Sequence, residues 1–284
     1  MSLIGDIWRH PANRNRRFRA LANGACWQIW KRFVPRPFTI RYHGYLLPCY
    51  PDSRQASAAI YFNNWPDFWE MRFIQDYLRP GDRFVDVGAN IGLYSLLAAR
   101  RVGESGCVVA FEPGEIPARR LEETCARNGI ATVGLHRSAV GEASGILDFL
   151  EGGEDCTRRP AVGGERSASR QVPVVRLDDL LDDNPYAMAK LDIEGYEPIA
   201  LRGMHRHLRV GNPAVLLVEA AGYSKQYGAS TDELMGDLGK LGYNPYYYDP
   251  ATRRVISAPK HWESGLTNVL CIRDLRKVQG RLEA

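Results

Sequence analysis

The pattern of apolar and polar positions changes abruptly near residue 88. Residues 83–87 form a short, largely apolar run, which is typical of a strand buried on both faces of a sheet. From Leu93 onward the apolar residues recur at helical spacing, and Gly88 and Gly92 lie between the two patterns. A strand, a tight turn and a helix in this order predict the first unit of a nucleotide-binding α/β sheet.

The downstream chain repeats this alternation. The last two predicted strands are joined by too few residues for a helix, so we expect the final strand to run antiparallel. We therefore predict an α/β fold with a seven-stranded, mostly parallel sheet, an antiparallel last strand and helices on both faces. The other predicted strands are 107–111, 132–136, 188–193, 213–218, 243–248 and 266–272, and the helices after residue 100 are 116–128, 177–181, 197–208 and 231–241.

Shorter elements precede and interrupt this order. Residues 38–48 and 57–62 have the pattern of short strands, and residues 145–150 and 171–175 have that of a strand pair. Residues 151–170, inside the pair, are rich in glycine and charge and nearly free of core residues, which predicts a long loop. Two interpretations remain open: a lid that closes over a substrate, and a tolerated surface insertion.

Charge is unevenly distributed along the chain. The net charge is +4, but residues 1–38 hold eight basic residues and one acidic residue, so the remainder is mildly acidic. We expect a basic, tryptophan-containing extension over residues 1–45, a catalytic domain over 46–276 and a tail over 277–284. The extension either contacts an anionic membrane surface or a lipid-linked substrate, or packs on the catalytic domain or in a homodimer. No recognisable nucleic-acid module accompanies the charge, so nucleic acid is not an expected partner.

Composition also constrains the location. No run approaches the roughly 18 apolar residues of a membrane-spanning helix, and no secretory signal is recognisable. The six cysteines form no C-x-x-C pair, so no zinc site is expected. We expect a cytoplasmic protein in which any membrane contact is peripheral and at the inner face.

The turn after the first strand predicts a cofactor. It lacks the G-x-G-x-x-G pattern of dinucleotide-binding proteins, because Asn90 and Leu93 replace the second and third glycines. Asp86 suits a cationic ligand such as S-adenosylmethionine (SAM), and Glu112 ends the next strand, where an acid can accept both ribose hydroxyls. A nicotinamide site and a turn without ligand are the alternatives. The predicted SAM-binding residues of this region are Asp86, Gly88, Asn90, Gly92 and Glu112.

Two further segments are predicted to approach the cofactor. Ser138 and Ala139 follow the third strand at the edge where open sheets bind ligands, and we expect them near the adenine. An ordinary strand-end turn is the alternative. Residues 66–78 have apolar positions at helical spacing, and Glu70 on this helix is predicted to reach the methionine end of SAM.

A second informative stretch is Lys190–Gly195. If it is a strand, Lys190, Asp192 and Glu194 share one face, and three charges there are acceptable only at the ligand edge of a sheet. Glu219 ends the next strand and is expected beside Asp192. We predict that Lys190, Asp192 and Glu194 orient or deprotonate the acceptor, and that Asp192 and Glu219 are the candidate ligands for Mg²⁺. The alternative is a lysine–carboxylate network that only holds the turn.

Five ordered motifs resemble those of the FkbM family of SAM-dependent methyltransferases, over roughly residues 60–275. The resemblance implies a class I, Rossmann-like methyltransferase fold, SAM as cofactor, and methyl transfer to oxygen, often on a sugar or polyketide hydroxyl. The motifs are Pro80–Asp82, Phe84–Ser95, Phe111–Pro113, Arg176–Leu180 and Lys190–Pro198, with Leu201–Gly203 in addition.

The resemblance, together with the basic N-terminal extension, implies O-methylation of a sugar or glycan hydroxyl, in surface polysaccharide synthesis or on a saccharide-containing metabolite. Asp192 or Glu194 would take the hydroxyl proton, and His205 and His207 are weaker candidates for the base. Tyr223 is a similarly weak candidate for a contact with the acceptor. Two alternatives remain: methylation of a small, polyketide-type natural product, and a non-catalytic SAM-binding scaffold.

Overall fold

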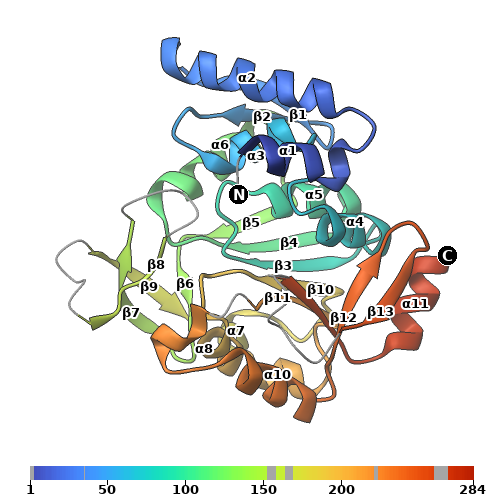
Figure 1. The fold of residues 1–284 in the computed structure, drawn as a ribbon. Coiled ribbons are helices and arrows are strands. Elements are labelled where there is room, and N and C mark those ends of the chain that lie inside the picture. Colours follow the sequence, from blue (N-terminus) through green and yellow to red (C-terminus); the bar gives the residue numbers. More distant parts are fainter. Residues whose placement is uncertain (1–2, 35, 152–157, 164–168, 221–222, 259–267) are drawn as a thin grey trace.

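A computed structural model gives the structure of the chain and describes residues 3–34, 36–151, 158–163, 169–220, 223–258 and 268–284. Its main sheet contains β3 (Arg83–Val87), β4 (Cys107–Phe111), β5 (Val133–His136), β10 (Met188–Leu191), β11 (Val215–Glu219), β12 (Asn244–Asp249), β13 (Arg254–Ser257) and β14 (Asn268–Ile272). The eight strands lie in the order β13-β12-β14-β11-β10-β3-β4-β5 (Figure 1).

Strand directions follow the sequence prediction. The strands β5, β4, β3, β10 and β11 pair in parallel, and β14 is antiparallel to both of its neighbours, β11 and β12. All seven expected strands are present, and β13 extends the edge as an eighth. This arrangement confirms the class I methyltransferase fold.

Helices cover both faces of the sheet because its central strands are apolar on both sides. In β3, Phe84 packs into one core layer, whereas Val85 and Val87 pack into the other. The first layer includes α4 (Phe68–Tyr77), α5 (Leu93–Val102) and α11 (Leu275–Glu283). The second includes α7 (Leu177–Leu180), α8 (Glu197–Arg202), α9 (His205–Arg209) and α10 (Thr231–Lys240), on the opposite side of the sheet in Figure 1. The helix α6 (Glu115–Asn128) packs beside β5.

Two sequence predictions need correction. Residues 57–62 are not a strand, because they fall largely within the helix α3 (Arg54–Tyr61), which begins where the Ser53 hydroxyl accepts a hydrogen bond from the Ala56 N–H (3.2 Å). The predicted helix 197–208 is two helices, α8 and α9. The chain bends at Gly203, where a side chain would overlap with the Gly141 carbonyl.

A second, four-stranded sheet lies beside the first. It contains β6 (Ala139–Val140), β7 (Gly145–Leu150), β8 (Arg159–Pro160) and β9 (Ser169–Val175) in the order β6-β9-β7-β8. The antiparallel pair of β7 and β9 confirms the expected strand pair. Most of the predicted loop 151–170 lies outside the described residues, so the lid and the surface insertion both remain predictions.

The N-terminal elements are α1 (Leu3–Arg9), the 3-10 helix η1 (Pro11–Asn13), α2 (Arg17–Phe33), β1 (Phe38–Tyr42) and β2 (Tyr45–Cys49). Their buried side chains belong to the same core layer as α4 and α5, and so do those of α11 at the C-terminus. The proposed division at residues 45 and 276 stays a prediction.

None of the helices in the described ranges is long and apolar enough to cross a membrane.

Candidate functional site

A cleft of about 310 Å³ opens at the C-terminal edge of the main sheet, where open α/β sheets bind ligands. Residues that follow four neighbouring strands line it: Gly88 after β3, Glu112 after β4, Asp192 after β10, and Glu219 at the end of β11. The cleft brings together most of the predicted site residues, namely Gly88, Asn90, Glu112, Ser138, Ala139, Lys190, Asp192, Glu194 and Glu219.

Glycine is required at the turn because the end of β10 lies against it. Gly88 has φ = +79°, and a Cβ atom there would overlap with the Asp192 carbonyl oxygen. The N–H groups of Gly88 and Ala89 both donate to the Phe111 carbonyl (3.0 Å), which ties the turn to β4. Gly92 does not line the cleft. It begins α5 at φ = +92°, where any side chain would collide with Leu121.

Asp86 lies beneath the cleft and does not line it. Its side chain is fully buried; Oδ2 accepts from the Ser95 hydroxyl (2.6 Å), and Oδ1 is 3.6 Å from the Lys190 ammonium. Lys190 occupies the paired position on β10, lies 3.3 Å from an Asp192 oxygen and donates to the Gly88 carbonyl (3.2 Å). The predicted direct contact between Asp86 and a cationic ligand is therefore corrected, because the lysine of the adjacent strand already neutralises this carboxylate.

The electrostatics of this pair follow from its burial. Burial raises the pKa of Asp86, although Lys190 and the Ser95 hydroxyl act in the opposite direction. Burial alone would lower the pKa of Lys190, but the carboxylates of Asp192 and Asp86 outweigh it, and the pKa is raised. Lys190 is therefore a fixed positive charge at neutral pH, held 4.7 Å above the Tyr94 ring.

Glu112 faces the cleft from the end of β4. Its two carboxylate oxygens accept from the N–H groups of Asn90 (2.8 Å) and Gly114 (2.7 Å), which fixes its orientation. Each oxygen keeps a second lone pair for a ligand hydroxyl. Burial raises its pKa to about 7, against the opposing effect of those N–H groups.

Ser138 and Ala139 also line the cleft, at the start of β6. Ser138 is buried, and its hydroxyl oxygen has no hydrogen-bond partner among the residues that the structure describes. A buried hydroxyl without a partner is costly, and a polar ligand in the cleft would satisfy it. This observation fits a nucleoside-type ligand such as SAM.

The sequence analysis missed Asp67, which faces the cleft from the start of α4. It occupies the N-cap position of α4 but makes no capping bond; its carboxylate accepts from the Tyr94 hydroxyl instead (2.9 Å). Burial raises its pKa, the Tyr94 hydroxyl lowers it and Asp192 raises it. An aspartate before a helix is typical of an ordinary cap, so the sequence alone offered no functional signal here.

Residues 192–196 form a turn after β10, which ends at Leu191, so Glu194 is not on a strand face as predicted. The turn passes through positive φ at Glu194 (+58°) and Gly195 (+95°). One oxygen of the buried Glu197 accepts from the Ile193 N–H (2.8 Å) and the Gly195 N–H (3.3 Å), which holds this shape. The turn presents both Asp192 and Glu194 to the cleft.

The acidic end of the cleft is crowded with carboxylates. Burial raises the pKa of Glu194 to about 7, with a further upward contribution from Asp192. Burial, followed by Asp192, Glu197 and Glu194, raises the pKa of Glu219 well above its usual range. No group of three or more His, Cys, Asp or Glu side chains suited to a metal ion occurs within the described ranges, and the Mg²⁺ site at Asp192 and Glu219 stays a prediction.

Glu70 and His205 lie elsewhere. Glu70 lines an adjoining cavity with Trp69 and Tyr246 rather than the cleft, and its contact with the cofactor stays a prediction. Burial, and then Asp67, raises its pKa to about 7. His205 lines a third cavity, between α8 and α10. The Tyr223 side chain is outside the described part of the structure.

A sequence profile of the methyltransferase FkbM domain matches residues 86–245, more than half of the chain. The chain belongs to the FkbM methyltransferase family. A comparison with curated protein sequences finds no match. As a member of the FkbM family, the protein is a SAM-dependent methyltransferase, and the cleft is its candidate active site.

Three solved structures are similar to this chain in fold, and these likenesses concern the fold alone. A SAM-dependent methyltransferase from Aquifex aeolicus is 15% identical with a TM-score of 0.42, and the match covers 73% of this chain and 90% of that chain. A SAM-dependent O-methyltransferase from Thermotoga maritima is 13% identical with a TM-score of 0.40, and the match covers 72% of this chain and 63% of that chain. Fibrillarin from Aeropyrum pernix, solved with bound SAM, is 12% identical with a TM-score of 0.41, and the match covers 72% of this chain and 73% of that chain.

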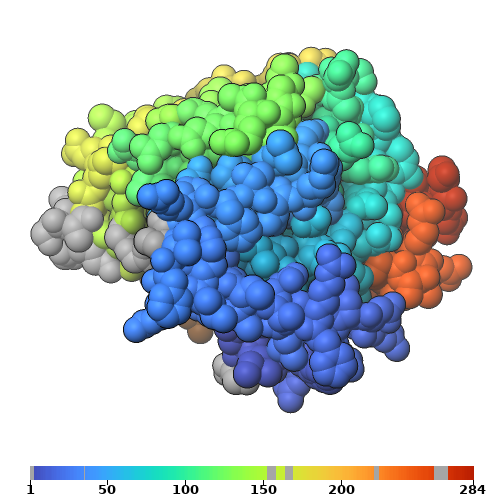
Figure 2. Space-filling view, turned by 90° about the horizontal axis from the view of Figure 1, so that it is seen from above, coloured from blue at the N-terminus to red at the C-terminus, as the bar shows by residue number. Residues whose placement is uncertain are grey.

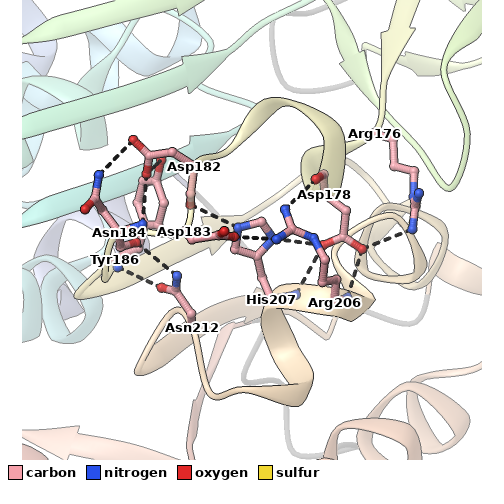
Figure 3. A network of polar contacts seen from close by, with 9 residues as sticks. All are labelled: Arg176, Asp178, Asp182, Asp183, Asn184, Tyr186, Arg206, His207 and Asn212. Carbon is pink, nitrogen blue, oxygen red and sulfur yellow. Dashed lines mark hydrogen bonds and ion pairs between the residues drawn. The ribbon is translucent and has the colours of Figure 1, made fainter.

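One motif that resembles the FkbM family, Arg176–Leu180, has a structural role away from the cleft (Figure 3). The Asp178 carboxylate accepts from the backbone N–H groups of Arg206 (2.8 Å) and His207 (3.2 Å) and from the His207 ring (2.8 Å). Burial alone would raise the pKa of Asp178, but these bonds outweigh it and lower the pKa. His207 is itself buried, and its other ring nitrogen contacts the Asp182 carbonyl (3.1 Å), so it is not placed to act as a base in the cleft.

Proposed function

We propose that this FkbM-family protein transfers the methyl group of SAM to a hydroxyl group of a sugar or glycan. When bound, SAM supplies an electrophilic methyl group, so the tasks left to the protein are alignment and removal of the hydroxyl proton. The observation that carries the proposal is the group of carboxylates at one end of the cleft: Asp192, Glu194 and Glu219.

Different parts of the cleft suit different parts of the cofactor. Glu112, oriented by two backbone N–H groups, suits the ribose hydroxyls, and the unpartnered hydroxyl of Ser138 suits the adenine side. Asp67, which lines the same cleft, is a carboxylate of the type that binds an ammonium group. In this proposal Asp67 replaces Asp86 as the group that faces the methionine amine.

Glu194 is the proposed general base. A base works best when its pKa is close to the operating pH, and burial raises the pKa of Glu194 to about 7. Lys190, a fixed positive charge beside Asp192, stabilises an oxyanion that forms as the proton leaves. Sugar hydroxyls are suited to such a cluster because carboxylates accept hydrogen bonds from neighbouring hydroxyls and so fix the ring.

The test is a methyl-transfer screen with labelled SAM against methyl glycosides, nucleotide sugars, lipid-linked glycans and small polyketide-type alcohols, with Mg²⁺ or with EDTA. Product analysis identifies the methylated atom. We expect transfer to oxygen of a saccharide, and a loss of about 10²- to 10⁴-fold in kcat/KM for Glu194→Gln with unchanged SAM affinity. The matched control is Glu142→Gln, since that carboxylate is exposed and forms an ion pair with Arg202.

Three results would contradict the proposal. Methyl transfer to nitrogen would contradict the proposed O-methylation. Methyl transfer only to polyketide-type alcohols would favour a small-molecule methyltransferase. SAM binding without transfer to any acceptor class would favour a non-catalytic scaffold.

A further inference from the structure

The outward face of α2 carries an apolar stripe. Phe18, Ala22, Ala25, Ile29 and Phe33 follow one another at intervals of three or four residues, which places them along one line of the helix. All five are exposed, and the exposed fractions of Phe18, Ile29 and Phe33 are 79%, 60% and 72%. At 1.5 Å per residue the stripe is about 22 Å long.

This stripe is not the face that holds α2 on the protein. The buried residues of α2 are Ala20, Gly24 and Trp27, on the opposite side of the helix. Gly24 packs against Ile7 and Tyr61, and the Gln28 amide donates to the Tyr61 hydroxyl (3.0 Å). The helix therefore has two apolar faces, of which one is satisfied by packing.

The helix α1 extends the exposed apolar surface. Leu3, Ile4 and Trp8 are 47%, 67% and 37% exposed, and the Trp8 ring meets the Phe18 ring edge-on, with centroids 5.6 Å apart. Half of the large apolar side chains exposed in the described structure lie within residues 3–34. Figure 2, which looks down on this side, shows the N-terminal segment in blue as one continuous outer surface.

The charge around this surface is predominantly positive. Residues 1–38 contain eight basic residues and one acidic residue. Arg19 and Arg32 lie on either side of the apolar stripe by helical position, and neither has a carboxylate partner among the described residues. Arg17 is stacked over the Trp8 ring at 5.0 Å, so the arginines and the aromatic rings form one surface.

We propose that the outer face of α1 and α2 docks the protein on an anionic lipid bilayer, with α2 lying in the plane of the interface. Apolar side chains that insert between lipids, flanked by arginines that contact anionic headgroups, are the two components of interfacial helices. A second copy of this chain fits the surface less well, because it would bring two basic faces together.

Docking in this orientation brings the cleft close to the membrane. Tyr61 of α3 contacts α2, whereas Gln55 and Ala58 of the same helix line the cleft. The cleft is therefore about one helix diameter, roughly 10 Å, from the docked helix. An acceptor held at the bilayer would then be within reach of the cleft. This consequence rests on the proposed function, whereas the docking itself does not.

The experiment is flotation of the full chain with vesicles of phosphatidylcholine alone and of phosphatidylcholine mixed with phosphatidylglycerol, at low and high salt. We expect binding to the anionic vesicles that weakens with salt. The triple variant Phe18→Ser/Ile29→Ser/Phe33→Ser should bind about a thousandfold more weakly, since each inserted side chain is worth about tenfold. The matched control is Ile146→Ser/Val210→Ser, which removes two side chains that are 71% and 76% exposed elsewhere.

Thermal unfolding and light scattering complete the test. All the substituted side chains point outward, so the variants should unfold at the temperature of the parent protein. Absence of vesicle binding by the full chain, or equal binding by the triple variant and the control, overturns the proposal. So does a dimer of the parent protein that the triple variant converts to a monomer, because the stripe would then join two copies of the chain. SAM affinity, measured in parallel, should be unchanged, which separates a failure of docking from a failure of the proposed function.

Discussion

Replacing Lys190 with methionine removes the ammonium group that is paired with the buried carboxylate of Asp86. The ion pair is 3.6 Å long, and the Asp86 side chain is fully buried. The hydrogen bond from Ser95 remains, but one neutral donor does not compensate a buried charge. Removing one partner of a buried pair costs about 3–5 kcal/mol, and we expect a loss of that size in the free energy of unfolding.

The double variant Lys190→Met/Asp86→Asn separates the lost charge from the lost packing. The double variant removes both charges of the pair, so no uncompensated charge is left at this position. Asp86→Asn alone would instead leave the buried lysine without this carboxylate. Replacing both partners of a buried ion pair often changes the free energy of unfolding little. The double variant should therefore be more stable than Lys190→Met by at least about 2 kcal/mol. Asp192 loses the same partner, but its side chain is 35% exposed and solvent screens it.

The pH dependence of the single variant gives an independent check. Burial already raises the pKa of Asp86, and without Lys190 the folded-state pKa rises further. At pH values between the unfolded-state pKa and the folded-state pKa of Asp86, the folded protein keeps a proton on Asp86 that the unfolded protein has released. The free energy of unfolding therefore falls as the pH rises through this range. The loss in the free energy of unfolding, relative to the parent protein, should be small near pH 3.8, the pKa of an unperturbed aspartate, and larger at neutral pH. The double variant should lack this dependence.

The assay is urea unfolding followed by circular dichroism at several pH values, with SAM affinity and methyl transfer measured on the same samples. A loss below about 1 kcal/mol for the single variant, or a double variant that is equally unstable, would refute the argument. Methyl transfer at the parental rate in the double variant would assign Lys190 a purely structural role and overturn its predicted part in catalysis.

Three further predictions concern the turn, the polar network and the proposed base. Gly88→Ala should lower the unfolding free energy by about 3 kcal/mol or more, because its Cβ would overlap with the Asp192 carbonyl; a parental melting temperature would contradict this. Asp178→Asn should cost about 1–3 kcal/mol in urea unfolding, through weaker bonds to the start of α9 and to His207, with methyl transfer unchanged; lost transfer in a stable variant would contradict the structural role. Methyl transfer should rise between pH 6 and 8 as Glu194, whose pKa is about 7, loses its proton, and a Glu194→Gln variant with the same pH profile would exclude it as the base.

Local patterns were sufficient for the fold. The apolar runs of the main sheet, the glycines of the turn after β3 and the helical spacing of Leu93 onward each depend on a few neighbouring residues, and all appear in the structure. Chain connectivity then limits the strand order, because consecutive parallel strands need crossover helices and the last pair lacks one. The clustering of Glu112, Asp192 and Glu219 at one edge followed from the same rule, since the carboxyl ends of parallel strands meet there.

Long-range packing decided the rest. The pairing of Asp86 with Lys190 depends on the register of two strands that are far apart in the chain, and it converts a predicted ligand contact into a buried ion pair. Asp67 lines the cleft, and its carboxylate accepts a hydrogen bond from Tyr94 of α5 instead of capping α4.

What the sequence by itself determined is thus the sheet, its turn chemistry and the edge at which the candidate site lies, because these depend on local periodicity and on connectivity. Only the tertiary structure decided which charges face the cleft and which neutralise one another beneath it. It also decided which side of α2 is buried. Both faces of this helix are apolar, so the spacing of its apolar residues does not distinguish the buried face from the exposed face.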